Sequence, residues 1–163
     1  MPVPGTRANL GPVLREERLA EELFAAARAI KHRLRPELER EGLTGPMFWA
    51  LNQLVLDGPL SVGALAGACV VTPANVSAVA DDLEAAGLVA RGSSARDRRV
   101  VVLTVTPRGR AMHRTVSRRF ADVLLETTRG LPASDLDATG RVLSRLVALA
   151  GGTPVASFEG DHA

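Results

Sequence analysis

An arginine-rich turn lies between two runs of residues that favour β-strands. The turn spans residues 91–99 with the sequence RGSSARDRR, and the flanking runs, 88–90 and 100–105, are mostly Val and Leu. Apolar, β-branched runs on both sides of such a turn predict a two-stranded hairpin. Its charged residues are Arg91, Arg96, Asp97, Arg98 and Arg99. Four guanidinium groups on one exposed turn favour an anionic partner, because each can bind a phosphate or carboxylate through paired hydrogen bonds.

The positive charge of the chain is gathered in one region. The formal net charge is +2, from 20 basic and 18 acidic residues. Residues 91–119 contain nine arginines and one acid, a local charge of +8, which leaves −6 on the rest of the chain. A solvated surface normally mixes both signs, so this asymmetry favours phosphate binding over a plain solvated basic face. All basic residues except Lys31 are arginine.

The segment before the hairpin predicts a short helix with a neutral N-terminal end. Thr72 and Pro73 provide a cap and a first-turn proline, and Gly87 ends the pattern. The apolar residues at i, i+3, i+4 and i+7, which predict the buried face, are Val76, Val79, Ala80 and Leu83. A helix followed by a basic hairpin is the outline of a winged DNA-binding domain, in which this helix would lie in the major groove. The side chains then expected to reach the DNA base edges from its first turns are Thr72, Ala74, Asn75, Ser77 and Ala78.

Asn75 is the preferred base reader of this helix, because its amide can make a bidentate contact to adenine. An equally open interpretation is that Asn75 only lies near the cap. The helix contains no basic residue and three acids, Asp81, Asp82 and Glu84, which would repel phosphates from its C-terminal half. Base reading is therefore expected at the N-terminal end, where the helix dipole also favours a phosphate.

The rest of the sequence predicts the helices that position these two segments. Apolar residues at spacings of three and four predict a helix from 13 to Pro36, where the proline ends or kinks it. Thr44 caps a second helix that stops at 57–59, and Ser61 caps a third over 62–69. The third helix and the one after Thr72, joined by about three residues, form a helix-turn-helix candidate.

Two more helices are expected after the hairpin. Thr106 and Pro107 open a long one that reaches about Arg129, and the last follows Pro132 and ends at 151–152. The fold class is therefore mainly α with a small β-hairpin. The expected organisation is a flexible arm over 1–12, a helical dimerisation region over 13–42 and 107–150, a winged helix-turn-helix module over 43–106, and a flexible tail over 151–163.

This order of elements resembles the MarR family of winged helix-turn-helix regulators over roughly residues 14–150. Each supporting motif is weak alone, but together, in order and at this spacing, they are a strong match. The motifs are Leu43-Thr44, Leu65-Ala66, Asp81-x-Leu83-Glu84-x-x-Gly87-Leu88-Val89, Asp97-x-Arg99 and Leu103-Thr104-x-Thr106-x-x-Gly109. One departure is that relatives often carry Arg or Lys at the positions of Ala78 and Asp82.

The resemblance implies a homodimeric, ligand-responsive transcriptional repressor held together by its terminal helices. The apolar stripes of these helices point the same way, since a winged module of about 65 residues cannot cover all of them. Two-fold symmetry implies a palindromic DNA site with half-sites about one helical turn, roughly 34 Å, apart. The resemblance also puts Arg99 in an A·T-rich minor groove, with Asp97 holding its guanidinium.

Several residues keep two interpretations. His32, Met47 and Trp49 form a candidate effector pocket between the dimerisation region and the winged module, but a core cluster for the apolar residues and surface positions for His32 and His113 are open alternatives. Peroxide-sensing relatives carry their cysteine in the first helix. Cys69 instead takes the place of a core residue in the third helix, which favours packing over a redox role.

Composition excludes other classes. The chain is 46% hydrophobic over 163 residues, enough for a packed core. No apolar run of about 18 residues predicts a membrane span, and the first residues lack the apolar stretch of a signal peptide, which predicts a cytoplasmic location. A single cysteine and three dispersed histidines predict no metal site, and no motif predicts catalysis or a cofactor. The alternative function is a ligand- or protein-binding dimer that has lost operator recognition.

Overall fold

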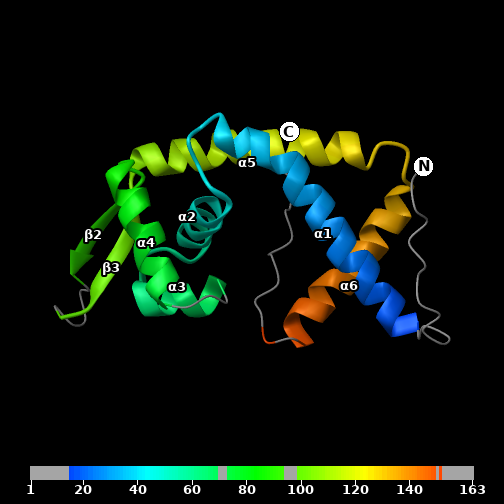
Figure 1. Cartoon of the computed structure of the whole chain (residues 1–163), viewed down its shortest axis with the longest axis horizontal. Helices are drawn as coiled ribbons and strands as arrows, with labels where there is room; N and C mark the ends of the chain where they lie inside the picture. Colours follow the sequence, from blue (N-terminus) through cyan, green and yellow to red (C-terminus); the bar gives the residue numbers. More distant parts are fainter. Residues whose placement is uncertain (1–14, 70–72, 94–98, 150, 152–163) are drawn as a thin grey trace, which may run out of the picture.

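The chain is mainly helical with a small antiparallel sheet, as predicted. A computed structural model describes residues 15–69, 73–93, 99–149 and 151, so the predicted arm and nearly all of the predicted tail lie outside it. The elements are α1 (Arg15–Glu39), α2 (Gly45–Asp57), β1 (Leu60–Ser61), α3 (Val62–Cys69), α4 (Pro73–Ala85), β2 (Val89–Ser93), β3 (Val101–Val105), α5 (Pro107–Thr127) and α6 (Ala133–Leu149). In Figure 1, the sheet and α2 to α4 lie at one end of the molecule, and α1 and α6 extend toward the other.

Three predicted helix caps are present. The oxygen of each capping side chain accepts a backbone N–H from the first turn: Thr44 from Met47 at 3.3 Å, Ser61 from Ala64 at 3.1 Å and Thr106 from Gly109 at 3.0 Å. Each bond satisfies a donor that has no partner inside the helix. The predicted cap at Thr72 lies outside the described residues.

Pro36 does not end the first helix. The helix continues through it to Glu39, and the chain turns at Gly42, whose φ is 68°. Leu34 and Leu38, on either side of the proline, are both buried in the core. Packing of Leu38 therefore holds the last turn against the local cost of a proline within the helix.

The sheet has one strand more than the predicted hairpin. Its order is β1-β3-β2 with both pairs antiparallel, and Leu60 and Ser61 of β1 pair with Leu103 and Val102. Two residues are too few to show the alternation that marks a strand in a sequence. The main hairpin pairs Val89 with Val105 and Arg91 with Leu103.

A single core joins the winged part to the neighbouring helices. We call residues 45–105, from α2 to β3, the winged module. Its buried side chains include Leu51, Leu65, Leu83, Leu88 and Leu103. Leu34 and Leu38 of α1, and Val116 and Phe120 of α5, are buried in the same cluster. The predicted boundary between a winged module and a helical region therefore runs through a shared core.

The last helix differs from the rest. Within α6, all of whose residues the structure describes, no side chain is buried. Its leucines and valines are 38% to 77% exposed; they are Leu136, Val142, Leu143, Leu146, Val147 and Leu149. Figure 1 shows α6 leaving the end of α5 on the side away from the sheet.

Candidate nucleic-acid interface

Helix α4 presents a neutral face to solvent at its N-terminal end. Val76, Ala80 and Leu83 are buried, and Val79 packs against the same core. This burial of the face predicted from spacing fixes the rotation of the helix and leaves Ala74, Asn75 and Ala78 exposed and Ser77 half-buried. The predicted base-reading residues therefore share the outer side of α4, except Thr72, which lies outside the described residues.

The acidic half of α4 is partnered from the hairpin. Arg91 of β2 places Nη2 2.5 Å from Asp81 Oδ1 and Nη1 3.2 Å from Glu84 Oε2. The sequence groups Arg91 with the phosphate-binding arginines of the turn, whereas the structure gives it two carboxylates of its own chain. A contact of Arg91 with phosphate stays a prediction. Nothing in a single sequence marks this pair of contacts, since they depend on the angle between β2 and α4.

The base of the hairpin is tied to the helices that flank it. Thr106 donates its hydroxyl to the carbonyl oxygens of Gly87 and Leu88, at 2.8 and 3.2 Å, while it caps α5. Gly109 in the first turn of α5 lies against the same strand, so that an added Cβ would collide with the Leu88 carbonyl and come within 2.9 Å of Val105 Cγ1. The start of the wing is therefore fixed by the hydrogen bonds of Thr106 and by a close approach of α5 that only glycine at position 109 allows.

The turn of the hairpin is only partly described. Residues 94–98 lie outside the structure, and with them Arg96, Asp97 and Arg98. Arg99 is described and exposed just before β3. The predicted support of Arg99 by Asp97, and its entry into the minor groove, stay predictions.

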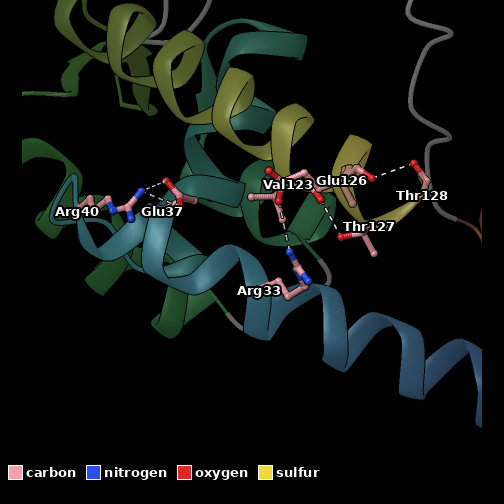
Figure 2. A network of polar contacts seen from close by, with 8 residues as sticks. Arg33, Glu37, Arg40, Val123, Glu126, Thr127 and Thr128 are labelled. Carbon is pink, nitrogen blue, oxygen red and sulfur yellow. Dashed lines mark hydrogen bonds and ion pairs between the residues drawn. The ribbon is translucent and has the colours of Figure 1, made fainter. Parts of the chain in front are cut away.

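The basic segment continues along α5. Arg108, Arg110, Arg114 and Arg118 are exposed. Arg119 instead pairs with Glu41 at 2.7 Å, which ties α5 to the turn after α1. A second tie between these helices is seen in Figure 2, where Arg33 of α1 reaches Glu126 of α5 at 3.6 Å. Not all of the +8 segment is therefore available to an external anion.

His113 is half-buried where α5 packs on α2, so it is not a plain surface histidine. Its ring stacks on Phe48 with centroids 5.7 Å apart, and Nε2 lies 2.8 Å from Asn52 Oδ1, to which it donates. Burial, and then the nearby Arg114, lower the pKa of His113 below its ordinary value. The neutral imidazole therefore joins α2 to α5 at the junction of the winged module.

A cavity of about 910 Å³ opens between α1, α2, α4 and α5. Its apolar wall includes Trp49 and Phe120, its charged rim is Lys31 and Arg35, and Asn75 and Ala78 of α4 also line it. Of the three residues predicted for an effector pocket, Trp49 lines this cavity, 48% exposed, whereas Met47 is buried in the core. His32 is exposed on α1 and is not among the lining residues. No motif marks the basic pair on α1, but Lys31 and Arg35 each lie three residues before a buried leucine, Leu34 and Leu38.

Metal binding, membrane insertion and cysteine chemistry can be judged for the described residues. No group of three His, Cys, Asp or Glu side chains in that part of the chain could hold a metal ion. No described helix is both long and apolar enough to cross a membrane. Cys69 ends α3, as its predicted position in the third helix requires, but its side chain is not described.

Residues 41–100 match a sequence profile of the MarR family. The chain is 31% identical to the HTH-type transcriptional repressor MdtR of Bacillus subtilis over 97 residues, 57% of this chain and 63% of the relative. It is 41% identical to an HTH-type transcriptional repressor of Mycobacterium tuberculosis over 83 residues, 48% of this chain and 60% of the relative. The matched segment thus covers less than two thirds of the length of these curated relatives.

Solved structures extend the likeness to most of the chain. BpsR of Bordetella bronchiseptica, a protein whose DNA binding is regulated by 6-hydroxynicotinic acid, is 27% identical with a TM-score of 0.70, covering 83% of this chain and 97% of that one. Its likeness spans the outer helices as well as the winged module. The chain is thus similar to a MarR-family profile over residues 41–100, to curated repressors over part of its length, and to BpsR in its fold.

Proposed function

We propose that the protein is a dimeric, sequence-specific DNA-binding transcriptional regulator, a ligand-responsive repressor that acts on a palindromic operator in the cytoplasm. The observation that carries this proposal is one module in which a helix with a short, neutral outer face lies beside a hairpin that ends in arginines. The curated relatives, which are transcriptional repressors, support the same activity.

In the proposed complex, α4 enters the major groove with its N-terminal end. Asn75 pairs with adenine, and Thr72, Ala74, Ser77 and Ala78 contact neighbouring base edges or the thymine methyl group. The hairpin lies along the adjacent backbone, where Arg96 and Arg98 meet phosphates and Arg99, held by Asp97, enters the minor groove. Contacts to phosphate set the register, and contacts from α4 supply the sequence information.

The proposed dimer is formed by the helical region, 13–42 with 107–150, and residues 43–106 of each copy are its DNA-binding part. The exposed apolar residues of α6 support it, as do Leu19, Leu23 and Phe24 on the outer half of α1, which are 37% to 66% exposed. A stripe of leucines on an amphipathic helix gains free energy only when another surface covers it. A second copy of the chain covers it symmetrically and sets two α4 helices one helical turn of DNA apart.

The proposed effector site is the cavity beside Trp49. Its apolar wall and the ammonium of Lys31, with Arg35 nearby paired to Glu39, suit a small molecule with an apolar body and an anionic group. Because Asn75 and Ala78 form part of the wall, an occupant would touch the DNA-reading helix itself. Trp49 is the only tryptophan, so binding of aromatic carboxylates can be followed by its fluorescence, and a bound compound should weaken operator affinity. If aromatic carboxylates bind beside Trp49 but leave the affinity for DNA unchanged, this site is not the effector site.

Selection from random duplexes, followed by salt titration, tests the proposed DNA binding. A palindrome should be enriched, and its affinity should fall with salt at about 0.9 log units per log unit for each phosphate neutralised. Arg99→Ala should reduce that slope by about one phosphate, whereas Arg129→Ala, beyond the far end of α5, should leave it unchanged. A flat salt response, or Arg99→Ala binding like the parent, contradicts the proposal.

The second candidate function, a dimer that has lost operator recognition, is favoured only by the acids of α4. Two of them, Asp81 and Glu84, are paired with Arg91, which lowers their repulsion of phosphate. The same selection separates the two functions, since an enriched palindrome excludes the second.

A further inference from the structure

We propose that Arg91 is a positioning residue: through Asp81 and Glu84 it fixes the angle between the wing and α4, and so determines how well the protein distinguishes its operator from other DNA. The inference rests on the proposed function. It differs from the general expectation for a basic wing, because Arg91 acts here through two carboxylates and not through phosphate.

Apolar anchoring of the wing ends at the level of Arg91, which is the first support for this role. Along β2 only Val89 is buried, and the described residues from Ala90 to Ser93 are exposed. Leu103, the last buried residue on the β3 side, lies opposite Arg91 in the register. Beyond this pair, Val102 is half-buried and pairs with Ser61 of β1, and the other described residues of the hairpin are exposed, so side-chain packing holds its outer part only weakly.

The second support is the geometry of the ion pairs. Arg91 contacts Asp81 at 2.5 Å and Glu84 at 3.2 Å, and these acids lie one turn apart on α4. Their side chains are 63% and 40% exposed and that of Arg91 is 34% exposed. One planar guanidinium that bridges two carboxylates restricts rotation as well as distance, which a single Lys ammonium does not do.

The third support is the position of this bridge along the wing. Closer to the core, Thr106 and Gly109 already fix the strand at Leu88. Arg91 adds a tether farther out along β2, on the strand that leads into the turn before Arg99. Because a strand rises about 3.3 Å per residue, a small tilt at Arg91 becomes a larger displacement at the turn. Simultaneous contact of α4 with bases and of the wing with the backbone depends on that angle.

Loss of the Arg91 bridge and loss of negative charge have opposite effects on DNA binding. Removing two carboxylates from a DNA-binding surface should strengthen binding to every duplex. If the carboxylates hold Arg91, their removal should instead weaken the preference for the operator over an unrelated duplex. The ratio of the two affinities cancels the general electrostatic gain and reports the geometry.

The test measures this ratio for the full chain and three variants: Arg91→Ala, the double variant Asp81→Asn with Glu84→Gln, and the triple variant. Partly exposed ion pairs contribute up to about 1 kcal/mol each, so we expect each of the first two to lower the ratio about three- to tenfold. The triple variant should be no worse than Arg91→Ala, because all three remove the same bridge. Arg91→Lys should give an intermediate ratio.

Two control variants remove a charge far from the wing. Asp122→Asn on α5 and Arg129→Ala, both exposed, should keep the parent ratio. Thermal unfolding of each variant separates loss of geometry from loss of fold. A double variant that keeps the parent ratio within twofold overturns the proposal, and so does an Arg91→Ala variant that binds both duplexes equally less well with a salt slope lower by about 0.9. A parent protein that selects no sequence would instead contradict the proposed function.

Discussion

The winged module and α6 make opposite use of their apolar residues. In the module, four leucines are fully buried and lie in one core with α1 and α5; they are Leu51, Leu65, Leu83 and Leu103. In α6 the leucines face solvent, although their spacing is just as regular. The module is completed by its own chain, whereas α6 needs another surface. Under the proposed function, this difference separates the part that would recognise DNA from the part that would form the dimer.

The largest effect is expected from breaking the proposed interface. Leu143→Glu with Leu146→Glu should convert a dimer to a monomer, because each buried leucine contributes about 1.5–3 kcal/mol and a buried charge reverses that gain. The free energy of unfolding of the winged module should change little. Sedimentation across a range of protein concentrations measures the dissociation. Unchanged association would show that α6 does not form the interface.

A core substitution in the winged module should lower its stability whether or not the chain forms a dimer. Leu51→Ala should lower the free energy of unfolding by about 2–5 kcal/mol through lost burial and the cavity it leaves. Leu125→Ala on α5, where the side chain is 68% exposed, is the matched control and should cost far less in a monomeric background. Equal losses for the two leucines, measured by denaturant unfolding, would contradict the assignment of the core.

Close packing at the base of the wing predicts opposite signs for two glycines. Gly109→Ala should destabilise by about 1–3 kcal/mol, since the new methyl group meets the Leu88 carbonyl. Gly67→Ala on α3 has open space around its Cβ and should stabilise by about 0.5–1 kcal/mol through helix propensity. Thermal unfolding of both variants measures the signs. A stabilising Gly109→Ala would mean that α5 does not approach the strand this closely.

The smallest effect concerns His113 at the junction of α2 and α5. Its folded-state pKa is lowered, so the unfolded chain binds the proton more readily and folding favours the neutral ring. Stability should therefore fall as the pH drops below about 6.5, the ordinary value, and be fully present above it. His113→Gln should flatten this dependence between pH 5 and 7.5, whereas His32→Gln on the exposed face of α1 should keep it. A parent chain equally stable at both pH values would contradict the burial argument.

Local signals in the sequence were sufficient for most of the fold. Caps at Thr44, Ser61 and Thr106 and the period of α4 depend on residues a few positions apart, and the structure confirms them. The exception is Pro36, where packing of Leu38 outweighs the local preference. The two-residue strand β1 was missed because its only signal is its pairing with β3.

The candidate site was predictable in its outline and not in its contacts. The outer face of α4 follows from helical spacing. The bridge from Arg91 to Asp81 and Glu84, the burial of His113 beside Phe48, and the cavity beside Trp49 each join separate elements. Such contacts depend on the angles at which elements pack, and a single sequence carries no direct signal for those angles.

The central claim is that two copies, joined through their outer helices, read one duplex. The most direct measurement is the mass of the complex formed on the selected duplex, by light scattering after size-exclusion chromatography. We predict two chains per duplex, with half-sites about one helical turn apart, and a Leu143→Glu, Leu146→Glu variant that loses most of its operator affinity. A single chain bound to a site without symmetry, with the same affinity in that variant, would contradict the account.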